Sequence, residues 1–439
     1  MERGAGVLYP LPTLGSAAYD FVDFLVAAGQ RWWQILPLGP TGESLSPYQS
    51  RSAFAGNPAL LDPAATGTRD AAGSERFRAE AAAWIADYAL FVAVKAAQKG
   101  RPLPLWPDEL RCPDARILIK MRERYRSEIE AATREQQRFF QQWYKLKRYA
   151  NGKGLRIIGD LPIYVGEDSA DFWLRRSAFD VDSNGRPASS AGVPPDAFSA
   201  TGQIWNAPVY DWKTNCKEVL RFWRDRLSQA AGLYDGIRID HFRAFADFYA
   251  VALDGSGAGQ WRPGPGRAFA DMIRREYPDL LVIAEDLGEL SEAARKLVKD
   301  SGFPDMKVLQ FAFDSDAENP HLPHKIAANS ICYTGTHDND TLRGWLDSRA
   351  ADECRKIADY LGAGEAQDLA DALITAALAS EAQIAIIPIQ DWLGLGSEAR
   401  LNTPGTTGGR NWRWRIPQRA LTPQLAARIR HATKRFNRM

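Results

Sequence analysis

Two charged residues lie two positions apart at the end of one apolar run of the sequence. In the segment Tyr234–Phe242, Arg238 and Asp240 stand on either side of Ile239 in a predicted strand. Because side chains alternate along a strand, these two residues should face the same side and meet. A guanidinium beside a carboxylate lowers its pKa and keeps it ionised, as a nucleophile or an electrostatic stabiliser requires. A structural ion pair explains the pattern equally well.

A second apolar run, Leu280–Ala284, ends in the adjacent acids Glu285 and Asp286. Adjacent side chains of a strand point to opposite faces, so only one of the two acids can enter a site. We take Glu285 as the candidate for a partly desolvated acid whose raised pKa lets it donate and recover a proton. Asp286 or Glu289 is expected to cap the helix that follows.

A third apolar run begins at Ile331 and leads into the polar segment Thr336–Thr341. This order places His337 and Asp338 at the carboxyl end of a strand, where barrel enzymes carry their chemistry. A turn cap explains the neighbouring polar residues equally well. Two of the five histidines, His337 and His241, stand beside strand-end acids, which favours a functional interpretation.

A fourth acid, Asp160, ends the run Ile157–Gly159. Several carboxylates at one rim permit either exchange of glycosidic bonds or a divalent metal that polarises a carbonyl. A metal site would need three acids without a neutralising arginine, and usually a lysine base at another strand end. The sequence has Arg238 and no such lysine, so it favours glycosidic chemistry without a metal or cofactor. A metal-dependent barrel lyase remains the remote alternative.

The elements that must position these residues alternate between short apolar runs and stretches of helical periodicity. This alternation predicts βα units and a parallel sheet. Eight runs match the strand count of a closed (β/α)8 TIM barrel, and no Gly-rich phosphate turn follows the first run, as a doubly wound sheet would usually require. The predicted strands are Gly6–Leu11, Trp32–Leu38, Ile157–Val165, Tyr234–Phe242, Leu280–Leu287, Val308–Phe313, Ile331–Asp338 and Ile384–Gln390.

The largest excess over a plain barrel lies at residues 39–156, between the second and third runs. It contains two helical stretches, Glu80–Lys99 and Ala115–Ala150, the second of which reads as one long amphipathic or interrupted helix. We therefore expect a single catalytic domain over residues 1–439, with a helical subdomain inserted at the carboxyl end of its strands. The Gly-rich segment 402–409 predicts a mobile loop near the last strand.

The composition is that of a packed globular protein, because 45% of the residues are hydrophobic and 25% are charged. A net charge of +1 lacks the basic footprint of proteins that bind nucleic acid or membrane surfaces. Four cysteines without a C-x-x-C pair predict a reducing, cytoplasmic location. No secretory leader and no apolar run near the ~18 residues of a membrane span are found, so we expect neither export nor membrane insertion.

Together with further motifs, the acid segments resemble the amylomaltases, the 4-α-glucanotransferases of the α-amylase clan. The resemblance covers nearly the entire chain and implies a retaining (β/α)8-barrel enzyme. Such an enzyme moves α-1,4-glucan segments to the 4-hydroxyl of another glucan or of glucose. The further motifs are Gly29–Thr41, Ser46–Ser50, Phe198–Gln203, Ala312–Asp314 and Gly394–Gly405.

Residue by residue, the resemblance implies that Asp240 is the nucleophile, Glu285 the acid/base and Asp338 the stabiliser of the transition state. Maltooligosaccharides and other α-1,4-glucans are the implied partners, with Tyr48 and Trp205 as stacking platforms. The implied substrate contacts are Tyr48, Asp160, Gln203, Trp205, Arg238, His241, His337 and Asn402.

The chain departs from the family pattern in several places. The loop after the first strand, Pro10–Gly15, and the segment Asp62–Phe77 are short, which bears on glucan length preference and acceptor retention. Asn206 and Ala244 stand where the family usually has glycine. The shortened loops keep two alternatives open: an α-glucan hydrolase with the same acids, and a glucan-binding protein without turnover.

Overall fold

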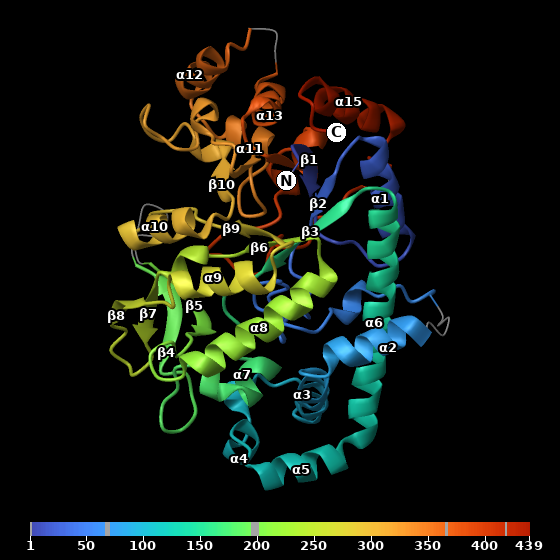
Figure 1. The fold of residues 1–439 in the computed structure, drawn as a ribbon, viewed down its shortest axis with the longest axis vertical. Helices are drawn as coiled ribbons and strands as arrows, with labels where there is room; N and C mark the ends of the chain where they lie inside the picture. The colour runs from blue at the N-terminus through green and yellow to red at the C-terminus, as the bar shows by residue number, and fades with distance from the viewer. Residues whose placement is uncertain (1, 66–70, 195–201, 365–367, 418) are drawn as a thin grey trace.

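The structure is a computed structural model that describes residues 2–65, 71–194, 202–364, 368–417 and 419–439. Its centre is a sheet of eight parallel strands that curls into a nearly closed barrel, in the order β10-β11-β12-β1-β2-β3-β6-β9 (Figure 1). The predicted (β/α)8 barrel is confirmed, and each predicted run overlaps one strand, the sixth run only at Val308. The strands are β1 (Gly4–Leu8), β2 (Trp32–Gln34), β3 (Arg156–Leu161), β6 (Gly236–Ile239), β9 (Leu281–Ala284), β10 (Asp305–Val308), β11 (Ser330–Tyr333) and β12 (Ile384–Pro388).

Strand β10 lies earlier in the chain than predicted. The apolar run Val308–Phe313 supplies only its last residue and then forms a 3₁₀ turn, η5 (Leu309–Phe311). Within the strand, Met306 and Val308 are buried, whereas the residues between and before them are charged and only half-buried. The strand therefore has an alternating pattern rather than a continuous apolar one.

The barrel has a seam between β9 and β10, which share no strand ladder. Two hydrogen bonds cross this seam. The N–H of Ala284 donates to the carbonyl of Pro304 at 2.9 Å, and the N–H of Met306 donates to Oδ1 of Asp286 at 2.9 Å. The expectation that Asp286 or Glu289 caps the next helix is wrong, because α10 begins at Glu292 and Ser291 accepts from Ala294 N as its N-cap.

The barrel interior is filled by side chains that alternate along the strands. They form an apolar cluster separate from the larger core between the barrel and its helices. Interior side chains of β3, β6 and β9 become charged toward the carboxyl ends of the strands, so the apolar core ends where the candidate site begins. The cluster comprises Leu8, Trp32, Ile158, Leu281, Ile283, Met306, Val308, Ile331, Tyr333, Ile384, Ile386 and Leu401.

Helices connect most of the strands and cover the barrel, and in Figure 1 helices α11–α13 and α15 form the upper part of the view. The described link between β10 and β11 contains only 3₁₀ turns. The helices and turns of this layer are α1 (Ser16–Ala27), α7 (Ala170–Leu174), η3 (Arg176–Ala178), α8 (Cys216–Leu233), η4 (Phe242–Phe245), α9 (Arg267–Glu276), α10 (Glu292–Ser301), η6 (Pro323–Lys325), α11 (Leu342–Asp347), α12 (Ala351–Leu361), α13 (Leu369–Ala379), α14 (Ile389–Leu393), η7 (Ser397–Ala399) and α15 (Pro423–Arg435).

The segment between β2 and β3 is helical and fills the lower part of the view in Figure 1. The predicted helix Glu80–Lys99 is in fact the end of one helix and the whole of another. The second predicted stretch is interrupted at Tyr125, and its longer half buries Phe139, Phe140 and Trp143 on one face. The elements are η1 (Pro58–Leu60), α2 (Ala71–Ala81), α3 (Ile85–Ala97), η2 (Leu103–Leu105), α4 (Asp108–Arg111), α5 (Ala115–Arg124) and α6 (Arg126–Gly152).

A four-stranded antiparallel sheet, which the sequence did not lead us to expect, stands beside the barrel at the lower left of Figure 1. Its strands are inserted after β3 and after β6. Strand β4 consists mostly of small residues, and β5 and β8 are partly exposed, so these three lack the apolar run of a barrel strand. Strand β7 does carry such a run, Phe248–Ala252, which the strand prediction did not include. The order is β5 (Gln203–Pro208), β4 (Ser189–Val193), β7 (Asp247–Ala252) and β8 (Gly259–Pro263).

None of the helices in the described part of the chain is both long and apolar enough to cross a membrane.

Candidate active site

One arginine at the carboxyl end of the barrel interior contacts three acids. Arg238 pairs in register with Asp160 across β3 and β6, and its Nη1 donates to both carboxylate oxygens of Asp160 at 2.9 Å. Its Nη2 lies 2.9 Å from Oδ1 of Asp240 and 3.9 Å from Oε2 of Glu285. The predicted meeting of Arg238 and Asp240 is confirmed, and the same guanidinium also joins β3 and β9 to the site.

The contact to one nitrogen limits how far apart the two acids can lie. Oδ1 of Asp240 and Oε2 of Glu285 both lie near Nη2 of Arg238, at 2.9 and 3.9 Å. The distance between these two oxygens therefore cannot exceed the sum of those two distances. The ~5–5.5 Å between the carboxyl groups of retaining glycosidases falls within this limit.

Glu285 has the environment of a proton donor. Its side chain is 9% exposed, and its carboxylate accepts from the N–H of His241 at 2.5 Å and of Leu287 at 2.8 Å. Burial is the largest cause that raises the pKa of Glu285, to about 7, and the nearby Asp240 raises it further, while Arg238 and the two N–H groups oppose this. The expectation of a raised pKa is confirmed.

The backbone next to Asp240 is folded for this contact. His241 has a φ of 49°, a left-handed conformation that costs a residue with a Cβ roughly 1–2 kcal/mol. Because this turn directs the His241 N–H at Glu285, it couples the end of β6 to the end of β9. Burial lowers the pKa of the His241 imidazole to about 3, so the ring is neutral.

The pKa of Asp240 differs from the sequence expectation. Arg238 lowers it as predicted, but burial raises it more, and the carboxylate of Asp160 adds to that rise, so the pKa lies above its usual value. The expected net lowering is therefore wrong, because desolvation of a carboxyl at the barrel mouth outweighs one guanidinium shared among three acids.

Asp338 lies in the opposite kind of environment. Its Oδ1 accepts from Nδ2 of Asn402 at 2.6 Å, and its Oδ2 lies 3.3 Å from Nε2 of His337. The imidazole and this amide hold the pKa of Asp338 well below its usual range, and Asp338 in turn raises the pKa of His337. The Asp338 side chain is 45% exposed, so the carboxylate is anchored yet open to a ligand.

Tyr48 connects the two groups of acids. Its hydroxyl donates to Oδ2 of Asp160 at 2.6 Å and lies 3.4 Å from Nδ1 of His337. Its ring stacks on the His337 imidazole, with ring centroids 4.9 Å apart. One face of the predicted Tyr48 platform is thus occupied by His337.

Gln203 and Trp205 reach the site from the antiparallel sheet. Trp205 Nε1 donates to Gln203 Oε1 at 3.1 Å, and the Trp205 ring meets His241 edge-on at 4.9 Å between centroids. The structure therefore brings both residues to the Asp240 side. Most of the motif Phe198–Gln203, its first four residues, lies outside the described residues.

The two exchanged glycine positions differ. Asn206 has a φ of 52°, and asparagine tolerates this left-handed conformation better than most residues. Ala244 is buried at 1% exposure and is not among the described residues with positive φ, so its Cβ introduces no such strain.

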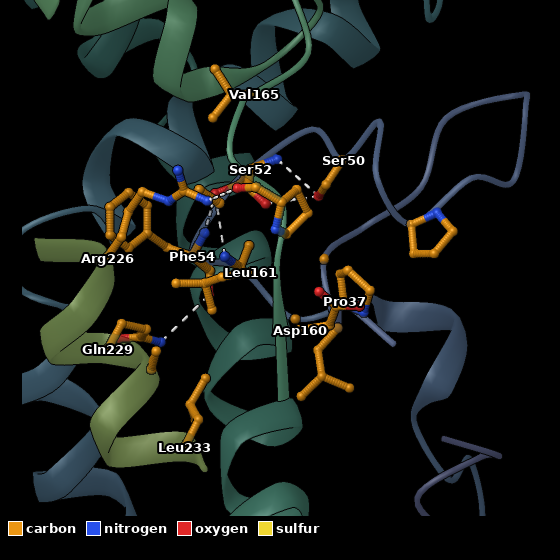
Figure 2. A pocket seen from close by; sticks show the side chains of 18 of the residues that line it. Pro37, Ser50, Ser52, Phe54, Asp160, Leu161, Val165, Arg226, Gln229 and Leu233 are labelled. Atoms are coloured by element: carbon orange, nitrogen blue, oxygen red, sulfur yellow. Dashed lines mark hydrogen bonds between the residues drawn. The ribbon is translucent and has the colours of Figure 1, made fainter. Parts of the chain in front are cut away.

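A cavity lies behind Tyr48 and Asp160, between the loop after β2, the end of β3 and helices α6 and α8 (Figure 2). It offers about 60 Å³ to the centres of water molecules, enough for several waters at ~10–15 Å³ each. Gln229 lines it with a buried Oε1 that has no hydrogen-bond partner. Asp240, Glu285 and Asp338 do not line this cavity, so it is not the space in which these three acids face a ligand.

Two residues near Asp338 were given no role by the sequence. Arg400 donates from Nη2 to the carbonyl of Asp338 and from Nε to the carbonyl of Asn402, each at 2.7 Å. Trp412 packs on Tyr48 and His337 with ring centroids 5.8 and 5.9 Å away. Arg400 lies within the motif Gly394–Gly405, whereas Trp412 follows a Gly-rich loop and carried no strand signal.

Within the described ranges, no group of three or more His, Cys, Asp or Glu side chains is arranged to hold a metal ion. A barrel with two carboxyl groups joined at its mouth is typical of enzymes that act on glycosidic bonds. The fold and this arrangement define the class of the protein as a glycoside-processing (β/α)8-barrel enzyme.

Comparison with known proteins identifies the family within this class. The family model described as 4-alpha-glucanotransferase matches residues 11–74 and 65–422, so the chain belongs to the 4-α-glucanotransferase family. The 4-alpha-glucanotransferase of Thermus thermophilus is 39% identical over 482 positions, covering 98% of this chain and 96% of that protein. That of Clostridium butyricum is 36% identical over 477 positions and covers 98% of both.

Solved structures agree with this assignment. The amylomaltase of Streptococcus agalactiae in complex with acarbose has a TM-score of 0.93 and 32% sequence identity, with all of both chains covered. The amylomaltase of Corynebacterium glutamicum, at 15% identity and a TM-score of 0.75, covers 99% of this chain and 75% of its own and supports the fold. The protein is therefore a glycosyltransferase of the 4-α-glucanotransferase type, and the hydrolase and binding-protein alternatives are not favoured.

The comparisons also bear on the shortened segments. The alignment with the Thermus thermophilus enzyme is longer than the 439 residues of this chain, so that enzyme has segments that this chain lacks. The two stretches matched by the family model overlap at residues 65–74, within the segment Asp62–Phe77.

Proposed function

We propose that this chain disproportionates maltooligosaccharides by a double displacement in which Asp240 is the nucleophile and Glu285 the acid/base. The observation that carries the proposal is the contact of both carboxyl groups with one nitrogen, Nη2 of Arg238. This contact keeps the two acids close enough to face one glycosidic bond from both sides.

In the first step, an Oδ of Asp240 attacks the anomeric carbon while the bond from that carbon to the glycosidic oxygen breaks. Neutral Glu285 gives its proton to the leaving oxygen. In the second step, the 4-hydroxyl of an acceptor sugar attacks the same carbon and gives its proton to Glu285. The bond to Asp240 breaks, and the enzyme returns to its starting state.

Asp338 stabilises the positive charge that develops on the sugar ring. It suits this role because His337 and Asn402 keep it ionised while leaving it partly exposed. The remaining proposed substrate contacts are Tyr48, Asp160, Gln203, Trp205, Arg238, His241, His337 and Asn402.

The reaction is carried by one catalytic unit over the whole chain, in which the helical segment between β2 and β3 is an inserted subdomain. The contact of Tyr48, from the loop after β2, with Asp160 of β3 supports this arrangement as a single unit. We also place the protein in the cytoplasm, which accords with its four free cysteines.

Incubation with maltotriose tests the proposal. We expect a ladder of longer oligomers together with free glucose, and the loss of both in Asp240→Asn. If maltose and glucose are the only products, the enzyme is a hydrolase and not a transferase. If the protein binds glucan without turnover, and Asp240→Asn binds it equally well, the protein is only a glucan-binding protein. The short loops are expected to shift the chain-length distribution of this ladder.

A further inference from the structure

Three aromatic rings form a continuous wall beside Asp338. Tyr48 and His337 are nearly parallel, with an angle of 19° between their planes, and Trp412 lies tilted against both rings at 44° and 37°. Trp412 is half-buried and comes from the segment before α15, far along the chain from its two partners.

The backbone of Trp412 is held in an unusual conformation. Its φ of 64° is left-handed, which is a genuine outlier for a bulky side chain, and strained residues of this kind gather at ligand clamps. Its N–H donates to the carbonyl of Leu401 at 2.7 Å, so the chain returns to its starting point after the Gly-rich loop. Asn411 ties the loop further, because its Oδ1 accepts from Thr403 N at 3.1 Å and its Nδ2 donates to Thr406.

This closed loop touches the site at both of its ends. Asn402, at its start, holds Oδ1 of Asp338, and Trp412, at its end, packs on the ring that faces Oδ2 of Asp338. The Asp338 carboxylate is thus positioned from two sides by one loop, once directly and once through His337.

The imidazole of His337 must satisfy two neighbours at once, Asp338 at Nε2 and Tyr48 at Nδ1. Rotation of a histidine ring about its last torsion is only weakly restricted by its own chemistry. Packing must therefore fix the ring plane, and among the described residues the rings of Tyr48 and Trp412 are the aromatic ones in contact with it.

We propose that Trp412 is a positioning residue of the transferase reaction: it fixes the planes of Tyr48 and His337, so that Asp338 is aligned with the charge that develops on the sugar. This inference rests on the proposed function, in which Asp338 stabilises the transition state. It assigns Trp412 no contact with substrate.

The test compares Trp412→Ala with Trp412→Phe, which keeps a flat ring at the same place. Misplacement of supporting groups by about 1 Å can cost ~10²-fold in rate, so we expect Trp412→Ala to lower kcat/KM for maltotriose by about 10–100-fold. Trp412→Phe should recover most of this loss. Trp261→Ala is the matched control, since Trp261 is 46% exposed on β8 and contacts Tyr249 and Arg243 instead of the site acids.

Calorimetric titration with acarbose, an oligosaccharide mimic with a cationic nitrogen, separates positioning from folding. Trp412→Ala should raise the Kd for acarbose by about the factor by which it lowers kcat/KM, with the number of binding sites per chain unchanged. Fewer sites with an unchanged Kd would mean that the variant is only partly folded, which would overturn the proposal. Unaltered kinetics, or failure of Trp412→Phe to restore kcat/KM, would overturn it as well.

The wild-type protein in the same experiment separates the two proposals. If wild type makes no ladder from maltotriose, the proposed function itself fails. A wild-type ladder with unchanged Trp412→Ala kinetics would remove only the positioning role of Trp412.

Discussion

The two sides of the candidate site hold their acids by different means. On one side, Asp240 and Glu285 share one arginine at the ends of neighbouring strands, and burial raises both pKa values. On the other side, Asp338 has its own imidazole and amide partners from loops, and its pKa is lowered. The strand side can therefore hold a proton near neutral pH, whereas the loop side provides a permanent negative charge.

The difference shows how several carboxylates at the same end of the barrel can have different pKa values and therefore different chemical roles. The positive charge of Arg238 is shared by several acids and offsets the burial of Asp240 and Glu285 only in part. Hydrogen bonds made to a single acid, as at Asp338, keep that acid ionised. The predictions that follow test whether the two sides are as distinct as their environments indicate.

The largest effect is expected on the strand side. Glu285→Gln cannot protonate the leaving oxygen, so kcat for maltotriose should fall by about 10²–10⁴-fold. α-Maltotriosyl fluoride, whose leaving group needs no proton, should still form the covalent intermediate in this variant, as mass spectrometry can detect. Glu289→Gln, at an exposed position of the same loop, is the control. A Glu285→Gln variant with near-normal kcat would contradict the assignment.

Removal of the shared cation should cost stability. In Arg238→Ala, Asp160 keeps the Tyr48 hydroxyl but is left buried without its charged partner, and breaking a buried pair costs about 3–5 kcal/mol in the free energy of unfolding. Urea denaturation measures this loss. Arg224→Ala breaks a half-exposed pair with Glu276 and should cost at most ~1 kcal/mol. Equal losses in the two variants would show that the buried pair of Arg238 and Asp160 contributes no more than an exposed one.

On the loop side, Asn402→Ala removes a hydrogen bond to a charged group. Such bonds contribute about 1.5–3 kcal/mol. The loss of transition-state stabilisation calculated from kcat/KM should be of about this size, while the protein stays folded. Steady-state kinetics with maltotriose provide the measurement, and Asn329→Ala, at an exposed position away from the acids, is the control. If kcat/KM stays the same, Asp338 does not depend on Asn402.

The pH dependence should report the strand side. The pKa of Glu285 is about 7 and the reaction uses its neutral form, so kcat for maltotriose should fall as the pH rises through about 7. The same raised pKa means that Glu285 contributes stability below the pKa it has in the unfolded chain, and that this contribution is lost as the pH rises through about 7. With α-maltotriosyl fluoride the decline of the first step should disappear. A decline that persists unchanged would belong to another group.

The smallest effect concerns Asn206, beside Trp205. Asn206→Ala forces an alanine into a left-handed conformation and should lower the free energy of unfolding by about 1 kcal/mol. Asn206→Gly should be tolerated, because glycine adopts this conformation freely. Thermal or urea unfolding of the pair decides this, and a more stable alanine variant would show that φ at this position changes.

Sequence reasoning reached the strand side because its signals are local. An arginine and an acid two positions apart in an apolar run already place Arg238 and Asp240 on one face, and the same alternation singles out Glu285. The direction of the pKa of Asp240 could not be obtained in this way, since it depends on how much solvent the completed barrel removes and on Asp160, a distant partner.

The loop side depends on contacts that no spacing encodes. Trp412 meets Tyr48 across most of the length of the chain, and its approach requires a closed loop with an unusual backbone at its end. Most of the antiparallel sheet was missed for a related reason, because β4, β5 and β8 gain their stability from neighbouring strands and not from an apolar run of their own. Strand β7 is the exception, since its run Phe248–Ala252 is visible in the sequence.

The seam between β9 and β10 makes one part of the site less stable toward local opening than the rest. Glu285 lies between Ala284 and Asp286, the two residues of β9 and its end through which hydrogen bonds cross to the β10 side. Segments with few backbone bonds open at lower free energy than fully paired ones, so amide exchange at Ala284 and Met306 should be faster than in β12. Warming would then disturb the proton donor before the barrel melts, and activity would decline at temperatures where the protein still retains its fold.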